Sequence, residues 1–149
     1  MFSLSCDYRV MVGPKYTIGL NETLLGVAAP FWLKDGLLNS VGFRQTELAL
    51  MKGTLFSTEE ALKVGLIDKA VTSREECLTE ANNFVKGMIK IPSEARHISK
   101  MLLRGKYVDQ LIKNKEQDLD HFVNFISKPE VQKSMGMYLE ALRAKSKKK

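Results

Sequence analysis

The sequence has few of the residues that build metal sites and disulfide frameworks. Its 149 residues include two cysteines and two histidines. Cys6 and Cys77 form no CxxC pair and no disulfide ladder, which favours a reducing compartment. His97 and His121 lie 24 positions apart, with no HExxH motif and no neighbouring cysteine. We therefore predict no metal site, and we expect both histidines to be surface or half-buried residues.

Long hydrophobic runs are also missing. Near Pro30 the longest uncharged stretch is Thr23–Leu33, whereas a membrane-spanning helix needs about 20 apolar residues. The first residues, Met1–Ser5, lack the basic start and long apolar centre of a signal peptide. Asp7 follows too early for a signal or transit peptide. We expect no membrane span and no leader sequence in this chain.

The sequence contains neither a P-loop nor a GxGxxG loop, and no serine lies in a GxSxG elbow. The net charge of +6 is concentrated at one end, because residues 143–149 carry +5 and residues 1–142 only +1. This distribution is typical of a solvated basic terminus. Contact with nucleic acid or an anionic membrane is the weaker alternative, since no interleaved basic and aromatic pattern occurs.

The first part of the chain contains short β-prone runs. Arg9–Val12 and Tyr16–Ile18 flank a Gly13-Pro14 turn, which predicts either a hairpin or two short buried strands. A further short strand is expected over Leu66–Val71. So few short strands cannot form a complete sheet by themselves, which indicates the second part of a larger α/β domain.

Helical patterns fill the rest of the sequence. Apolar residues at helical spacing predict a helix that begins near Pro30 and ends at Gly42, and a second over Gln45–Met51. Ser57 and Glu60 form a capping box before a third helix, as do Ser73 and Glu76 before a fourth. After Thr72 every segment is predicted to be helical. The expected segments are an apolar stripe over Cys77–Ile89, a restart at Pro92-Ser93, a longer helix over about Lys106–Ile126, and a last helix from about Pro129.

Glu22 is the acid that stands apart. It lies in an apolar stretch, Tyr16–Pro30, and its nearest acidic neighbours in the sequence are Asp7 and Asp35. A carboxylate in such surroundings is desolvated, which makes it a stronger base once it is ionised. The alternatives are that it pairs with a lysine or arginine or caps a turn. Cys6 follows an apolar run and is expected to be a small buried residue rather than a nucleophile.

Six segments together carry a resemblance to a known family. They are Cys6–Arg9, Ile18–Gly26, Ala29–Leu33, Ser57–Asp68, Phe122–Lys128 and Met137–Glu140. On these segments the chain resembles the crotonase (enoyl-CoA hydratase/isomerase) superfamily, and within it the branch that isomerises 3-enoyl-CoA. The resemblance covers nearly the whole chain. The Gly-Leu-Asn-Glu-Thr and Pro-Phe-Trp-Leu motifs are its most specific parts.

The resemblance implies an α/β crotonase-like fold, a repeated ββα spiral of which this chain is the C-terminal portion. That portion is expected to be mostly α-helical with a few short strands. Residues 1–72 would complete the core, residues 73–142 would form a helical C-terminal region, and residues 143–149 would be a basic tail. Trp32 is expected in the core, with a wall that contacts an acyl chain as the alternative.

The family's chemistry implies an enoyl-CoA isomerase of fatty-acid β-oxidation. Glu22 matches the catalytic glutamate that moves a proton from C2 to C4, and Asn21 matches a position that contacts the substrate. The coenzyme A thioester is the substrate, and no metal or other cofactor is expected. The resemblance further implies a homotrimer and a location in the mitochondrial matrix, although no transit peptide is expected from the first residues of this chain.

One departure affects the expected activity. In the family, two backbone N–H groups that hold the thioester oxygen come from loops upstream of the helix that ends at Cys6–Arg9. We therefore expect the 149 residues alone to be an impaired enzyme. Two alternatives stay open: a catalytically inactive chain that keeps a trimerising surface, and a hydratase-like enzyme. The hydratases use a second glutamate, and the position of that residue corresponds to about Met1 in this chain.

Overall fold

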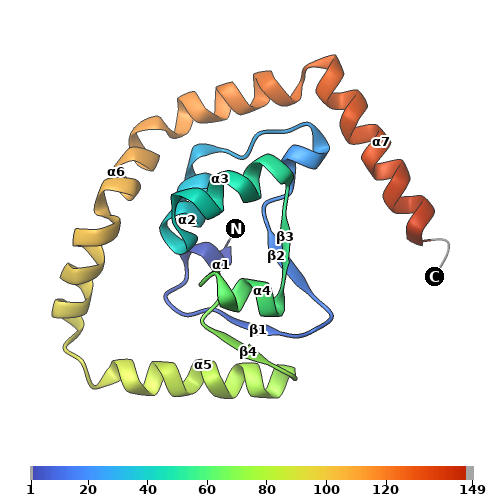
Figure 1. Cartoon of the computed structure of the whole chain (residues 1–149). Helices are drawn as coiled ribbons and strands as arrows, with labels where there is room; N and C mark the ends of the chain where they lie inside the picture. The colour runs from blue at the N-terminus through green and yellow to red at the C-terminus, as the bar shows by residue number, and fades with distance from the viewer. Residues whose placement is uncertain (1, 147–149) are drawn as a thin grey trace.

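Short strands and short helices alternate in the first half of the chain, and three long helices make up the second half (Figure 1). The computed structural model describes residues 2–146. The elements are α1 (Phe2–Ser5), β1 (Val10–Val12), β2 (Thr17–Gly19), the 3-10 turn η1 (Glu22–Leu25), α2 (Phe31–Val41), α3 (Phe43–Lys52), β3 (Leu55–Ser57), α4 (Thr58–Lys63), β4 (Lys69–Val71), α5 (Arg74–Ile89), α6 (Ser93–Ile126) and α7 (Pro129–Ser146).

The two β-prone runs at the start of the chain do not pair with each other. β1 pairs in parallel with β4, with Val10 opposite Lys69. β2 pairs antiparallel with β3, with Ile18 opposite Phe56. The hairpin interpretation is therefore wrong. The alternative of two short buried strands is correct in that the strands are separate, but neither contains a buried residue, and Thr17 of β2 is exposed. Arg9, just before β1, helps to bring β4 to its side, because its backbone N–H donates to Asp68 Oδ2 at 2.8 Å, just before β4.

The hydrophobic core is built from the first half of the chain. Its buried residues are Leu20, Leu37, Ala49, Phe56, Ala61, Leu66 and Ile67. The predicted strand over Leu66–Val71 is correspondingly shorter, because Leu66 and Ile67 enter the core and pairing begins at Lys69. Within residues 2–146, Val131 is the one buried hydrophobic residue from the three long helices. The division into residues 1–72, 73–142 and 143–149 stays a proposal.

The capping box before α4 is present as predicted. Ser57 Oγ accepts from the backbone N–H of Glu60 at 3.3 Å, and Glu60 Oε2 accepts from the backbone N–H of Ser57 at 2.8 Å. The second bond lowers the pKa of Glu60 below its ordinary value. Before α5 only half of the capping box forms. Ser73 Oγ accepts from the backbone N–H of Glu76, but the Glu76 carboxylate accepts from the backbone N–H of Thr72.

The helix predicted to begin near Lys106 is part of a longer one. α6 runs without a break from Ser93 to Ile126. Gly105 lies inside it and does not end it, because a single glycine costs only about 1 kcal/mol in a helix. The turn around Gly105 is also tied to the first half of the chain. Asp7 Oδ1 lies 2.8 Å from Lys100 Nζ and 3.1 Å from Arg104 Nη1, and the bond from Lys100 is the main cause that lowers the pKa of Asp7.

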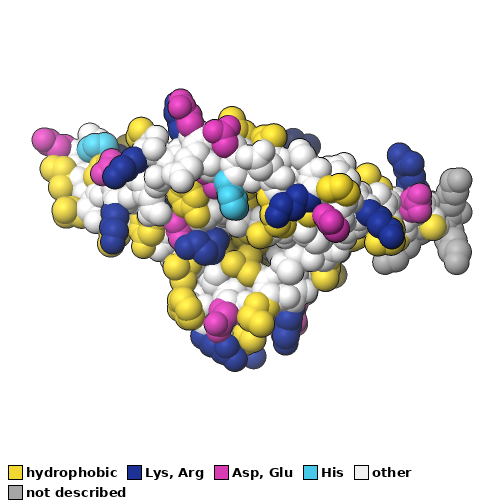
Figure 2. Space-filling view, turned by 90° about the horizontal axis from the view of Figure 1, so that it is seen from above, with side chains coloured by type: hydrophobic (Ala, Val, Ile, Leu, Met, Phe, Trp, Pro, Cys, Tyr) yellow, Lys and Arg dark blue, Asp and Glu magenta, His cyan; other side chains and the backbone are white. Residues whose placement is uncertain are grey.

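The long helices frame the core (Figure 1). Apolar side chains lie on the surface of the molecule (Figure 2). On α5 the predicted stripe is largely exposed, with Ile89 72% exposed, and on α6 Leu102 is 82% exposed. Both histidines are exposed, as expected. Each helix in residues 2–146 is too short or too polar to cross a membrane.

Cys6 is exposed, so the expectation of a buried thiol is wrong. The single turn of α1 ends at Ser5, and Cys6 follows it without lying beneath another element. Its Sγ donates to the Phe2 carbonyl oxygen at 3.3 Å.

The Ser57 cap gives a test of the local structure. Because Ser57→Ala removes the side-chain acceptor at the start of α4, we expect it to lower the free energy of unfolding by about 1 kcal/mol. The matched control is Ser99→Ala, an exposed serine inside α6, where alanine is the better helix former. Urea unfolding, monitored by circular dichroism, gives the free energy of unfolding of both variants. Equal midpoints for Ser57→Ala and the unmodified chain would contradict the capping role.

Candidate active site

Glu22 begins a tight turn between β2 and α2. The turn η1 closes with Val27 N–H donating to the Glu22 carbonyl at 3.0 Å and Gly26 N–H donating to the Thr23 carbonyl at 3.1 Å. Gly26 has a φ of 74°, in the left-handed region that glycine adopts without strain. The local sequence Glu-Thr-Leu-Leu-Gly thus forms one 3-10 turn with a glycine stop.

Two helices from later in the chain hold this turn. From α3, the Leu50 carbonyl oxygen accepts from Thr23 Oγ1. From α7, Ser134 packs so closely on Gly26 that a Cβ there would lie 2.9 Å from Ser134 Oγ. Asn21 Nδ2 also donates to the Tyr138 hydroxyl on α7, at 3.4 Å. The backbone that carries Glu22 is therefore fixed between α3 and α7.

The carboxylate of Glu22 carries an unpaired oxygen. The residue is half-buried. Its Oε2 is inaccessible to solvent and has no hydrogen-bond partner among residues 2–146. Leaving a buried acceptor unpaired costs about 1–3 kcal/mol, and more for a charged group, so a buried carboxylate oxygen without a partner calls for an explanation. The alternative role, a pairing with a lysine or arginine, is not seen among the described residues.

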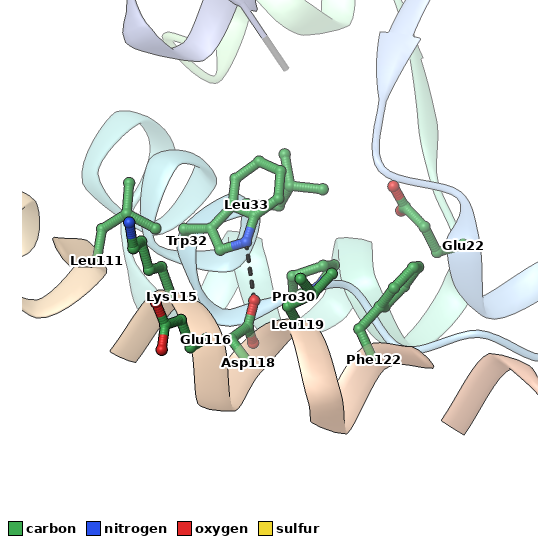
Figure 3. A pocket seen from close by; sticks show the side chains of 10 residues that line it. All are labelled: Glu22, Pro30, Trp32, Leu33, Leu111, Lys115, Glu116, Asp118, Leu119 and Phe122. Carbon is green, nitrogen blue, oxygen red and sulfur yellow. Dashed lines mark hydrogen bonds between the residues drawn. The ribbon is translucent and has the colours of Figure 1, made fainter. Parts of the chain in front are cut away.

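Glu22 lies at one end of a cavity of about 660 Å³, a size common for small-molecule sites. α2 and the residue before it supply one wall, and α6 supplies the other (Figure 3). The lining residues are Glu22, Pro30, Trp32, Leu33, Leu111, Lys115, Glu116, Asp118, Leu119 and Phe122. Figure 3 shows Glu22 at one end, Leu111 and Lys115 at the other, and Pro30 and Trp32 between them. The cavity can hold an extended, largely apolar ligand with one end beside a carboxylate.

Trp32 lines the cavity and is not a core residue. Its side chain is half-buried, and its indole Nε1 donates to Asp118 Oδ2 at 3.1 Å. The expectation of a core position is wrong, and the alternative of a wall position is the one that the structure supports. An indole N–H needs a hydrogen-bond partner when it leaves water, and a carboxylate on α6 provides one.

The contribution of α6 is what the sequence reasoning missed. Leu111, Lys115, Asp118 and Phe122 recur at spacings of four, three and four, so they lie on one face of the helix. In the sequence, the apolar members of this stripe supported only a predicted helix over about Lys106–Ile126. The charged members inside that stripe are the signal that could have marked a ligand site.

The other predicted site residue, Asn21, adjoins Glu22 but is not among the lining residues of the cavity. Its side chain faces Tyr138 instead. Among residues 2–146, His, Cys, Asp and Glu side chains form no group of three that could hold a metal ion.

The comparison with known families follows from this geometry. A family model described as Enoyl-CoA hydratase/isomerase matches residues 1–149. The chain belongs to the enoyl-CoA hydratase/isomerase family. The resemblance inferred from the motifs around Glu22 is thereby confirmed.

Two relatives with high identity to the chain are named as enoyl-CoA delta isomerases. The chain is 48% identical over 146 residues to mitochondrial enoyl-CoA delta isomerase 1 of Mus musculus, covering 97% of this chain and 50% of that protein. It is 44% identical over 144 residues to the Homo sapiens protein of the same name, covering 96% of this chain and 47% of the relative. The chain thus spans about half the length of the curated relatives it matches.

Solved structures confirm the crotonase-like fold. The crystal structure of human mitochondrial delta3-delta2-enoyl-CoA isomerase superposes with a TM-score of 0.90 at 44% identity, covering 95% of this chain and 55% of that chain. An enoyl-CoA hydratase from Bacillus halodurans superposes with a TM-score of 0.75 at 27% identity, covering 90% of this chain and 53% of that chain. The prediction that the chain corresponds to a portion of the family's domain is therefore correct.

The glycine stop after Glu22 gives a test of the site. Gly26→Ala places a Cβ at positive φ and against Ser134 Oγ, so we expect it to destabilise the fold by about 1–2 kcal/mol. Gly87→Ala in α5 is the matched control, because a Cβ there meets nothing within 4 Å, and alanine should stabilise the helix by up to about 1 kcal/mol. Differential scanning calorimetry compares the two. Equal shifts of the melting temperature would refute the role assigned to Gly26.

Proposed function

We propose that the chain is the catalytic-base portion of a Δ3,Δ2-enoyl-CoA isomerase, which converts 3-enoyl-CoA to 2-trans-enoyl-CoA. The observation that carries the proposal is the position of Glu22: a buried, unpaired carboxylate oxygen at the end of an apolar cavity. The identity of 44–48% to enoyl-CoA delta isomerases supports the same reaction.

Glu22 would move one proton and leave the substrate composition unchanged. Its carboxylate takes a proton from C2 of the 3-enoyl thioester, and the electron pair delocalises over C2–C4 and the thioester oxygen. The protonated Glu22 then returns the proton to C4, which leaves the double bond between C2 and C3. A single carboxylate suffices when it reaches both carbons, because no water is added. This step needs no metal and no redox partner.

The cavity walls would bind the acyl chain. Pro30, Leu33, Leu119 and Phe122 offer apolar surface next to Glu22, and each methylene that leaves water contributes about 0.8 kcal/mol. Apolar walls would also exclude water from the reacting carbons. We assign Asn21 to substrate contact by its place beside Glu22 in the family motif.

The partners and location follow from the same assignment. The substrate would be an acyl-CoA, and no cofactor beyond that thioester is proposed. Because the relatives are named as mitochondrial proteins, we infer a location in the mitochondrial matrix. A homotrimer is proposed by family resemblance, and the exposed apolar residues of α5 and α6 supply surface that could be buried in it.

Two other functions are kept as alternatives. A catalytically inactive chain that associates through α5–α7 is favoured by the many exposed apolar side chains on those helices. A hydratase-like enzyme would need a second carboxylate acting with Glu22 on a water molecule. Of the other carboxylates that line the cavity, Asp118 accepts a hydrogen bond from Trp32, which weighs against that use of it.

Glu22→Gln tests the proposed base. Gln keeps the shape of the side chain but cannot take a proton, so we expect turnover to fall by roughly 10²–10⁴-fold. The variant is made in an extended chain, in which the half of the Mus musculus relative that this chain does not cover is fused before Met1. Turnover of 3-enoyl-CoA and exchange of the C2 proton with deuterium from solvent are measured together.

The matched control in the same extended chain is Glu59→Gln, which changes an exposed carboxylate of α4. It should retain full turnover and full deuterium exchange. If Glu22→Gln keeps turnover within a few-fold of the unmodified chain, Glu22 is not the base and the assignment fails.

The 149 residues alone should isomerise 3-enoyl-CoA poorly, even with Glu22 intact. The reaction builds negative charge on the thioester oxygen, and Glu22 does not stabilise that charge. In the family the stabilising N–H donors precede Cys6–Arg9, and each such donor is worth about 2.7–4 kcal/mol. We expect turnover to be several orders of magnitude below that of the extended chain. Comparable steady-state rates for both chains would show that residues 1–149 supply the donors themselves.

A further inference from the structure

One polar contact joins the two walls of the cavity. The indole Nε1 of Trp32 at the start of α2 donates to Asp118 Oδ2 on α6, across 3.1 Å (Figure 3). Both residues line the cavity and both are half-buried. The indole has one donor, and its acceptor is a carboxylate, so the bond is charge-assisted and directional. It therefore restricts the orientation of the ring relative to α6.

The contact lies part-way along the cavity. Glu22 is at one end and Leu111 at the other, with Trp32 between them (Figure 3). An extended chain that begins beside Glu22 must pass the indole before it reaches Leu111. A short chain ends before that point. The orientation of Trp32 therefore matters for long ligands and little for short ones.

We propose that Asp118 is a positioning residue that holds Trp32 as the wall for the acyl chain and thereby sets the preference for acyl-chain length. This inference rests on the proposed function, because it takes an acyl-CoA as the ligand. With the wall in place, each further buried methylene strengthens binding by roughly fourfold. Without the hydrogen bond, the indole N–H must turn toward water to find a partner, and the apolar face leaves the path of the chain.

The binding test compares two saturated ligands, hexanoyl-CoA and dodecanoyl-CoA, which have no double bond to move. Isothermal calorimetry on the extended chain gives both dissociation constants. We expect Asp118→Ala to weaken binding of dodecanoyl-CoA by about tenfold or more and that of hexanoyl-CoA by less than about threefold. Asp118→Asn retains an acceptor oxygen and should behave like the unmodified chain. Asp120→Ala changes an exposed carboxylate of the same helix and is the matched control.

A second variant covers the case in which Asp118→Ala does not fold. Trp32→Phe keeps an aromatic ring but removes the donor, so it should also reduce the preference for dodecanoyl-CoA. Trp32 is the only tryptophan of the 149 residues, so its fluorescence in that chain reports on the wall without any ligand. Asp118→Ala should make Trp32 more accessible to quenching by acrylamide, whereas Asp120→Ala should not.

The outcomes separate this inference from the proposed function. An equal loss of affinity for both ligands, or an unchanged ratio of the two dissociation constants, overturns the role of Asp118. A ratio that depends on Asp118 in a chain that does not isomerise 3-enoyl-CoA supports the inference and refutes the isomerase assignment. If turnover depends on Glu22 but Asp118→Ala leaves the ratio of the two dissociation constants unchanged, the isomerase assignment is supported and the role of Asp118 is refuted. Failure of the extended chain to bind either ligand refutes both.

Discussion

The position of Glu22 depends on one short turn being held from two sides. Thr23 is bonded to the Leu50 carbonyl of α3, and Gly26 lies against Ser134 of α7. Because these contacts fix the backbone on both flanks, the carboxylate can keep a buried oxygen without a partner. A group in such an unfavourable state persists only where the surrounding structure over-determines it.

The opposite wall of the cavity is held in a different way. α6 contributes no buried residue, and hydrogen bonds and ion pairs tie it to the first half of the chain. Asp7 pairs with Lys100 and Arg104 at one point, and Asp118 accepts from Trp32 at another. Segments with few buried apolar contacts open at a lower free energy than core segments. The site thus combines a base on a backbone fixed from two sides with a wall that polar contacts hold in place.

The core and the long helices also differ in how they use apolar residues. Leu37, Ala61 and Leu66 are almost completely buried, within a cluster drawn from the short elements of the first half. The paired strands form two separate two-stranded ladders, and an isolated ladder of that size is marginal. The buried cluster that joins residues of α2, α3 and α4 with Phe56 of β3 therefore carries the fold, and the exposed apolar residues of α5 and α6 are available for further association.

Local signals in the sequence determined the caps and most of the helices, and a family motif identified the candidate base. The cap at Ser57 and Glu60 involves residues three positions apart, and α2 ends at the glycine that the pattern indicated. Glu22 was found because its motif resembles a family, whereas apolar neighbours alone left its role open. Only the tertiary structure decided which strands pair, that Cys6 is exposed, and that Trp32 meets Asp118. That last contact joins residues 86 positions apart, and the bond from Arg9 to Asp68 spans 59. Contacts at such separations leave no periodic trace in the sequence, because they depend on how whole elements pack and not on the spacing of residues within one element.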